Sequence, residues 1–141
     1  LLNRGIEYTD RVTDDSKGYR DSITIDLTVD RGGGVLRRTS VRGTVAEGAL
    51  MISRVDDFHK LYIEPTGHLV TFSYRDRPGV LGQIGAMLAG AGINIDDVRN
   101  PHDSKGEMSL AILRVNQPLT PDVVDRIARQ ITADIACAVT L

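Results

Sequence analysis

The sequence is poor in cysteine, histidine and aromatic residues. It has one cysteine (Cys137), three histidines and no tryptophan in 141 residues. A lone cysteine forms neither an internal disulfide nor a Cys-x-x-Cys site, and the histidines do not occur at metal-ligand spacing. Disulfide scaffolds, zinc modules and iron–sulfur proteins are therefore excluded, and we expect no metal site.

An excess of charge of one sign is also missing. Lys and Arg number 17, Asp and Glu number 19, and the formal charge is -2 with a pI near 5.9. This balance gives no electrostatic reason to expect binding to nucleic acid or to an anionic membrane. No apolar run reaches the roughly 18 to 20 residues of a membrane span, and residues 1–9 lack a signal-peptide pattern. We expect a cytoplasmic protein that has neither a nucleic acid nor a membrane as partner.

The composition that remains is that of a globular protein. Apolar residues make up 41% and charged residues 26% of the chain, which argues against extended disorder. Residues 1–5 have the pattern of a helix end with Gly5 as its cap. We therefore expect the sequence to be a piece of a longer protein.

The first 65 residues have the patterning of an antiparallel sheet. Residues 20–30 alternate between apolar and polar, which predicts a half-buried strand whose apolar positions are Ile23, Ile25, Leu27 and Val29. Glycines at 32–34 break the pattern. Further strands are expected over 35–45, 49–55 and 58–64, the last two joined by a two-residue turn at Asp56 and Asp57. Such a sheet needs a covering layer, which we expect upstream sequence to supply.

The hydrophobic period changes after residues 65–67, where proline and glycine interrupt the chain. A strand is expected over 69–75, a helix from Pro78 to Gly90, strands over 93–100 and 108–115, a helix capped by Thr120, and a strand over 135–141. The order βαββαβ is the ferredoxin-like arrangement, with two helices on one face of a four-stranded antiparallel sheet. We therefore divide the chain into residues 1–66 and 67–141.

The segment DRPGVLGQIG at residues 76–85 carries the clearest functional signal. Unpaired N–H groups in the first turn of the predicted helix would favour a carboxylate, and the glycines let a ligand approach the backbone. Asp76 before the helix and Asn94 on the next strand would then receive the remaining groups of a zwitterion. The alternative is that Asp76 only caps a turn and that the glycines only permit close packing.

The residues Asp76-Arg77-Pro78-Gly79-Val80-Leu81, followed by Ala91-Gly92-Ile93-Asn94-Ile95, resemble the signature of the ACT domain family. The upstream half is similar, at residues 4–7, 19–21 and 43–45, to the intervening domain of long-form D-3-phosphoglycerate dehydrogenases, where it precedes an ACT domain. The resemblance implies an α+β protein. It would have a partial α/β intervening domain, rich in antiparallel strands, over 1–66 and a ferredoxin-like ACT domain over 67–141.

The same resemblance implies a regulatory role. In that family the ACT domains pair side by side and bind L-serine at the interface as feedback effector of the NAD-dependent oxidation of 3-phosphoglycerate. The implied contacts are Tyr74, Asp76, Gly79, Val80, Leu81 and Asn94. Tyr74 shares a face with Val70 and Phe72, so a core aromatic with an exposed hydroxyl is the alternative for that residue. We expect L-serine or another small amino acid as ligand and a homodimer or tetramer. We expect no catalytic residue and no cofactor in this chain, with NAD held by the parent enzyme.

The resemblance also implies an anion site in the upstream half. Arg38 and Arg42 flank Ser40 on one face of a predicted strand, about 13 Å end to end, and their guanidinium groups are long enough to meet on one phosphate. A solvated charged face is the alternative.

Other functions fit the sequence less well. The run at residues 90–95 follows a helix and departs from the dinucleotide fingerprint, and the strand at 108–115 lacks the aromatic residues of an RNA-binding sheet. Cys137 is predicted to be buried and inert. A ligand-free structural oligomerisation module, or the regulatory part of an L-serine dehydratase, stays open.

Overall fold

The computed structural model describes residue 9 and residues 21–30 and 36–141. The predicted helix end at residues 1–5 and the glycine break at 32–34 lie outside this part of the chain. Residues 4–7 and 19–20, on which part of the resemblance depends, also lie outside it. The described residues form two four-stranded antiparallel sheets and two helices.

The first sheet consists of four strands in chain order. They are β1 (Ser22–Asp30), β2 (Leu36–Ala46), β3 (Ala49–Val55) and β4 (Phe58–Ile63). The predicted turn between β3 and β4 is confirmed, and Asp56 adopts a left-handed conformation there with φ 48°. Residues 64–67 join this sheet to the second one. The domain boundary at 66/67 stays a prediction.

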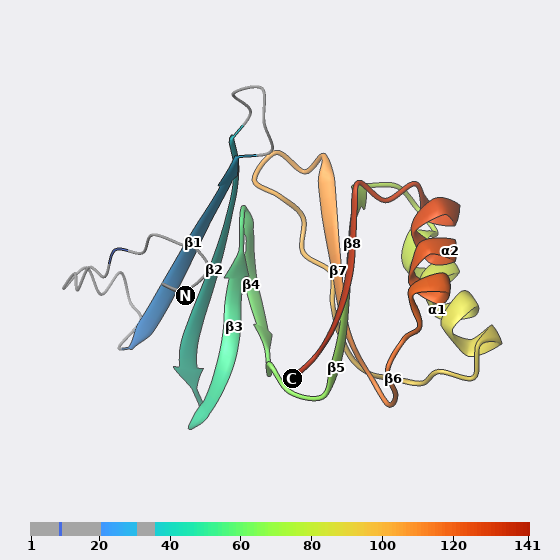
Figure 1. The fold of residues 1–141 in the computed structure, drawn as a ribbon, viewed down its shortest axis with the longest axis horizontal. Helices are drawn as coiled ribbons and strands as arrows, with labels where there is room; N and C mark the ends of the chain where they lie inside the picture. The colour runs from blue at the N-terminus through green and yellow to red at the C-terminus, as the bar shows by residue number, and fades with distance from the viewer. Residues whose placement is uncertain (1–8, 10–20, 31–35) are drawn as a thin grey trace.

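The second sheet carries both helices and has the predicted βαββαβ order. Its elements are β5 (His68–Arg75), α1 (Val80–Gly90), β6 (Ile95–Arg99), β7 (Met108–Val115), α2 (Pro121–Ile131) and β8 (Ile135–Thr140). The strands pair antiparallel in the order β6-β7-β5-β8, and both helices cover the same face (Figure 1). Neither described helix is long and apolar enough to cross a membrane.

The two helices begin differently. Thr120 occupies the N-cap position of α2, as predicted, although its side chain makes no capping hydrogen bond, and Pro121 occupies the first turn. The prediction that α1 begins at Pro78 is wrong by two residues. Gly79 takes a left-handed conformation with φ 87° at the N-cap, and regular helix starts at Val80. Glycine tolerates this φ because it has no Cβ.

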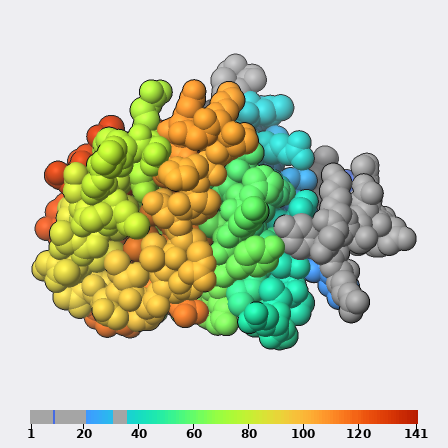
Figure 2. Space-filling view, turned by 180° about the vertical axis from the view of Figure 1, so that it is seen from behind, coloured from blue at the N-terminus to red at the C-terminus, as the bar shows by residue number. Residues whose placement is uncertain are grey.

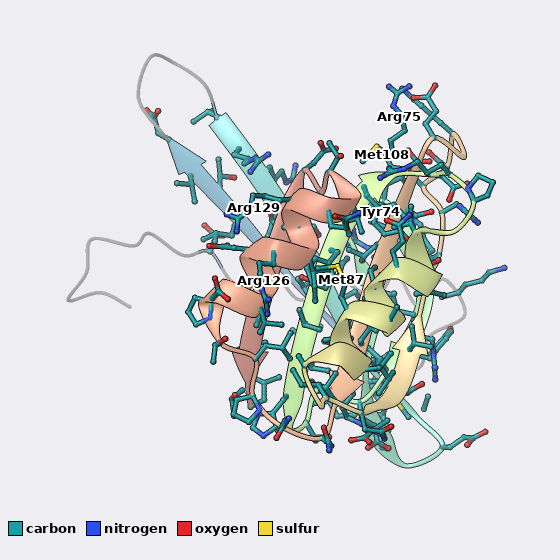
Figure 3. The ribbon with its side chains drawn as sticks, turned by 90° about the vertical axis from the view of Figure 1, so that its right-hand side faces the viewer. Tyr74, Arg75, Met87, Met108, Arg126 and Arg129 are labelled. Atoms are coloured by element: carbon teal, nitrogen blue, oxygen red, sulfur yellow. The ribbon has the colours of Figure 1, made fainter. Side chains whose placement is uncertain are left out.

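Two hydrophobic cores hold the layers together. Between the helices and the second sheet lie Val70, Phe72, Ile84, Leu88, Leu113 and Ile127. Met87 packs against this core at the level of the two helices (Figure 3). Burying each large apolar side chain contributes about 1.5–3 kcal/mol, so this helix-covered core contributes substantially to the stability of residues 68–140.

The second core joins the two sheets. Phe58, Leu61 and Ile63 of β4 pack on Leu69, Leu110 and Ile112, which point away from the helices. In Figure 2 the orange surface of the β6–β7 region borders the green surface of the β4 region. The molecule therefore has three layers: helices, second sheet and first sheet.

The prediction that β1 is half-buried is wrong for the residues that the structure describes. All nine residues of β1 are exposed, and the exposed fraction of its apolar side chains runs from 72% at Ile23 to 43% at Val29. Residues of β3 and β4 make the contact with the second sheet, so β1 lies beyond the edge of that contact. No other described element packs on this apolar face.

Candidate functional site

The first turn of α1 has backbone N–H groups without a hydrogen-bond partner in the helix. The first helical hydrogen bond runs from Gln83 N to Gly79 O, so the N–H groups of residues 80–82 have no partner within the helix. No side chain caps this end, and a Cβ placed at Gly79 or Gly82 would meet no atom within 4 Å. These donors and the helix dipole together favour an anionic group.

Asp76 comes three residues before the N-cap of α1, and its carboxylate is held in place by a residue of β7. Ser109 Oγ, which is fully buried, donates a hydrogen bond of 2.8 Å to Asp76 Oδ1. His102 Nδ1 lies 3.0 Å from the same hydroxyl and 3.7 Å from Asp76 Oδ1. The Asp76 side chain stays 39% exposed, so its carboxylate is both oriented and accessible to a cationic group.

Ser109, His102 and Asp76 do not form a catalytic triad. In a triad the histidine lies between the serine and the carboxylate, whereas here the serine hydroxyl lies between the other two groups. The hydroxyl proton is donated to Asp76, and Ser109 has no exposed surface. The arrangement orients a carboxylate and offers no accessible nucleophile.

Tyr74 lies in the core, as its spacing with Val70 and Phe72 predicted for the alternative, but its hydroxyl is not exposed as that alternative expected. Its side chain is 1% exposed, and its hydroxyl accepts a hydrogen bond of 3.0 Å from Asn100 Nδ2. Burial raises the pKa of Tyr74, the bond with Asn100 lowers it, and the charge of Asp76 raises it further. Figure 3 shows Tyr74, Arg75 and Met108 at one end of the sheet. The ring of Tyr74 lies in the core, and its hydroxyl is the part that contacts a polar residue, Asn100.

The structure separates Asp76 from Asn94 within one chain. Asp76 follows Arg75, which pairs with the first residue of β7. Asn94 precedes Ile95, which pairs with the last residue of β7. At about 3.3 Å per residue, the ends of this eight-residue strand lie roughly 23 Å apart. The expectation that both side chains meet around one ligand is therefore wrong for a single chain.

The remaining predicted contacts differ in accessibility. Val80 is buried with 1% of the residue exposed, its backbone included, whereas Leu81 is 38% exposed, so Leu81 is the accessible one of the two. Sequence reasoning missed Asn100, His102 and Ser109. A serine inside the apolar run of β7 was a signal for Ser109, because buried hydroxyls need partners. Nothing in the pattern connects Asn100 or His102 with Asp76.

The predicted anion site lies in an open depression on the first sheet. Its lining residues are Thr24, Asp26, Arg38, Ser40, Arg42, Arg54, Asp56 and Asp57. Arg38 pairs with Asp26 at 3.2 Å, and Arg42 Nε donates to Thr24 Oγ1 at 3.1 Å. Hydrogen bonding by Ser40, followed by the Arg38 charge, lowers the pKa of Asp26. Three arginines therefore face three aspartates, and Arg38 and Arg42 point to separate partners.

The prediction that Cys137 is buried is wrong, since this thiol is exposed. It lies on β8, where Ile135 and Val139 are each 44% exposed. The first sheet covers the outer face of β7 and leaves that of β8 open. Among the residues that the structure describes, no three His, Cys, Asp or Glu side chains gather in a way that would hold a metal ion.

Comparison with known proteins gives a consistent set of matches. The ACT domain family matches residues 68–132. A D-3-phosphoglycerate dehydrogenase of Bacillus subtilis is 26% identical over 129 residues, which cover 92% of this chain and 23% of that protein. A protein of the same name from Archaeoglobus fulgidus is 25% identical over 130 residues, covering 91% and 24%. One from Mycobacterium tuberculosis is 40% identical over 60 residues, covering 43% and 11%. The chain spans about a quarter of the length of the first two relatives.

Proposed function

We propose, from the match of residues 68–132 to the ACT domain family, that the chain is the amino-acid-sensing part of a D-3-phosphoglycerate dehydrogenase. In this proposal L-serine binds at the first turn of α1 as feedback effector. The whole enzyme would oxidise 3-phosphoglycerate with NAD at the start of serine synthesis. In this proposal that activity belongs to other parts of the enzyme, which hold the NAD.

The observation that carries the proposal is the pairing of free amides with an oriented carboxylate. The N–H groups of Leu81 and Gly82, both exposed residues, would bind the serine carboxylate, and Asp76, held by Ser109, would bind its ammonium group. Both partners are needed to favour a zwitterion over a simple anion or a simple amine. The ligand is therefore a free amino acid or a closely similar molecule.

A second copy of the chain would complete the site. Strand β6 is an edge of the second sheet, so its outer side has no strand partner among the described residues. If two copies pair antiparallel along β6, the start of β6 in one copy lies beside the end of β6 in the other copy. At that end Asn100 contacts Tyr74. Asn94 of a second copy would then lie near Asp76 of the first. A homodimer follows, with a tetramer as a further assembly.

Feedback would act through this interface. Serine bound between two copies favours the arrangement that holds both halves of the site together, and its differential affinity shifts the population of that arrangement. A coupling of about 1–3 kcal/mol to the catalytic parts is sufficient for feedback control. No contact between serine and the catalytic centre is required.

The depression on the first sheet is a second candidate site, for an anion such as phosphate. The observation in its favour is that Arg54 adds a third guanidinium group to Arg38 and Arg42. Binding would require the anion to displace Asp26 from Arg38. Titration with inorganic phosphate, followed by the shifts of the arginine Nε–H signals in NMR spectra, tests it. Shifts that saturate and that Arg38→Ala removes are expected, whereas unchanged spectra would contradict the site.

The test of the serine site is calorimetric titration. Wild-type chain is expected to bind L-serine saturably at millimolar concentration or below. Asp76→Ala and Asn94→Ala should each abolish the heat, while Asp122→Ala, an exposed carboxylate in the first turn of α2, should leave it unchanged. Absence of binding to wild type would favour a structural oligomerisation module, and glycine and other small amino acids would then be titrated.

A further inference from the structure

The loop at residues 101–107 has little packing of its own. It connects β6 to β7, and most of its side chains are exposed. Polar contacts therefore determine its position, because a loop without buried apolar side chains opens at a low free energy. The loop matters because it lies next to the candidate serine site.

This loop holds Asp76 through its backbone. Asp76 N donates a hydrogen bond of 2.9 Å to Glu107 O. Asp103 Oδ1 accepts bonds of 2.8 Å from Glu107 N and 3.2 Å from Met108 N, so it fixes the loop where Asp76 contacts it. The loop also brings His102 to within 3.0 Å of the Ser109 hydroxyl. Movement of the loop would therefore move the groups that orient Asp76.

The loop is attached to the first sheet by one carboxylate. Asp57 Oδ2 accepts hydrogen bonds from Ser104 N at 2.8 Å and from Ser104 Oγ at 2.5 Å. These two bonds are the main reason that the pKa of Asp57 is lowered. The contact joins the turn between β3 and β4 to residue 104, next to the Asp103 that fixes the end of the loop.

The turn that carries Asp57 is itself held firmly. Asp56 N donates to Ser40 O at 2.7 Å, and Asp56 Oδ1 accepts from Ser40 N at 2.7 Å. Arg54 Nη1 donates to Asp56 O at 2.7 Å. Asp57 therefore projects from a point that β2 and β3 fix, and it can hold the loop against that point.

We infer that Asp57 is a positioning residue of the effector site, through which the first sheet fixes the loop at residues 101–107 and thereby Asp76. The inference rests on the proposed function and explains how the geometry of the serine site is maintained. Asp57 does not contact the ligand. It acts through Ser104, Asp103 and Glu107, so the first sheet contributes to effector affinity although it supplies no ligand contact.

The test compares two substitutions of Asp57 in the full 141-residue chain. Asp57→Ala removes both bonds to Ser104 and should weaken L-serine binding about fivefold, because an exposed charge-assisted contact is lost. Asp57→Asn keeps an acceptor oxygen in the same place and should bind within about twofold of wild type. Glu64→Gln is the matched control, because Glu64, in the segment that joins the two sheets, pairs with Arg114 of β7 at 3.4 Å and away from the loop. It should bind like wild type.

A second measurement does not depend on serine. In the ligand-free chain, Asp57→Ala should speed amide hydrogen exchange over residues 102–108, while Asp57→Asn and Glu64→Gln should not. Unchanged serine affinity and unchanged exchange in Asp57→Ala, or equal losses in Asp57→Ala and Glu64→Gln, would overturn the inference. If wild type binds no serine, the proposed function is wrong, and the exchange result still decides whether Asp57 holds the loop.

Discussion

The hydroxyl of Ser109, which has no exposed surface, donates a hydrogen bond of 2.8 Å to the carboxylate of Asp76. Ser109 is the second residue of β7, and Asp76 follows the end of β5, the strand paired with it. The sheet therefore fixes one Asp76 oxygen and leaves the carboxylate 39% exposed. This relationship makes Asp76 a preorganised receptor for an ammonium group.

Ser109→Ala removes this bond and should lower L-serine affinity about tenfold, since a hydrogen bond to a charged acceptor contributes roughly 1.5 kcal/mol. Calorimetric titration measures the change. Ser53→Ala is the control, because the Ser53 hydroxyl is also buried but donates to Arg42 O in the first sheet. Its serine affinity should equal that of wild type. An unchanged affinity in Ser109→Ala would mean that the hydrogen bond from Ser109 is not needed to orient Asp76 for serine binding.

Tyr74→Phe should leave serine affinity within about twofold and lower the free energy of unfolding by about 1 kcal/mol at pH 8, because the bonds with Asn100 are lost. The variant should also differ from wild type in alkali. The pKa of Tyr74 is raised above its ordinary value of 10.0, so its contribution is present below pH 10 and is lost as the pH rises through the folded-state pKa. Urea unfolding at pH 8 and above pH 10 measures both effects.

The control for this substitution is Tyr62→Phe, a tyrosine 36% exposed on β4. It should retain the alkaline loss of stability that wild type shows, whereas Tyr74→Phe should reduce it. Equal alkaline losses in wild type and Tyr74→Phe would contradict the role given to the buried phenol.

Thr132→Gly should stabilise the chain by roughly 0.5–1 kcal/mol and raise the melting temperature by a few degrees. Thr132 ends α2 in a left-handed conformation with φ 52°, which strains a β-branched residue and suits glycine. Thr120→Gly, at the N-cap of the same helix with φ -73°, should give no gain. Thermal unfolding followed by circular dichroism compares them, and a lower melting temperature for Thr132→Gly would contradict the strain.

Ile25→Thr should change the free energy of unfolding by less than about 0.5 kcal/mol, because Ile25 is 66% exposed on β1. Val70→Thr, at a fully buried position on β5, should cost about 1–3 kcal/mol, because it places a hydroxyl in the helix-covered core. Urea denaturation of dilute protein measures both. A loss above about 1.5 kcal/mol in Ile25→Thr would mean that the apolar face of β1 is covered in solution.

Local pattern predicted most of the fold. The spacing of Val124, Ile127 and Ile131 placed α2, the alternation before Arg75 placed β5, and the Asp56–Asp57 pair placed the turn of the first sheet. Each of these features depends on neighbours in sequence. The exposure of β1 and Cys137 depends on how the two sheets overlap, which periodicity does not encode.

The site was predictable only in part for the same reason. Asp76 and the glycine before α1 belong to one continuous segment, so the motif located them. Ser109 lies 33 positions after Asp76 in the sequence, and the register of β5 with β7 brings the two together. The separation of Asp76 from Asn94 also follows from sheet order, because β5 and β6 flank β7 and run in the same direction. Residue types alone do not specify that geometry.

The central claim is that one serine site combines Asp76 of one copy with Asn94 of another, and mixing two variants tests it most directly. Asp76→Ala and Asn94→Ala should each bind no serine alone. After subunit exchange in an equal mixture, half of the dimers contain both variants and each has one intact site, so about one site in four should return. Calorimetry should detect these sites at wild-type affinity. A mixture that binds no more serine than either variant alone would contradict the account.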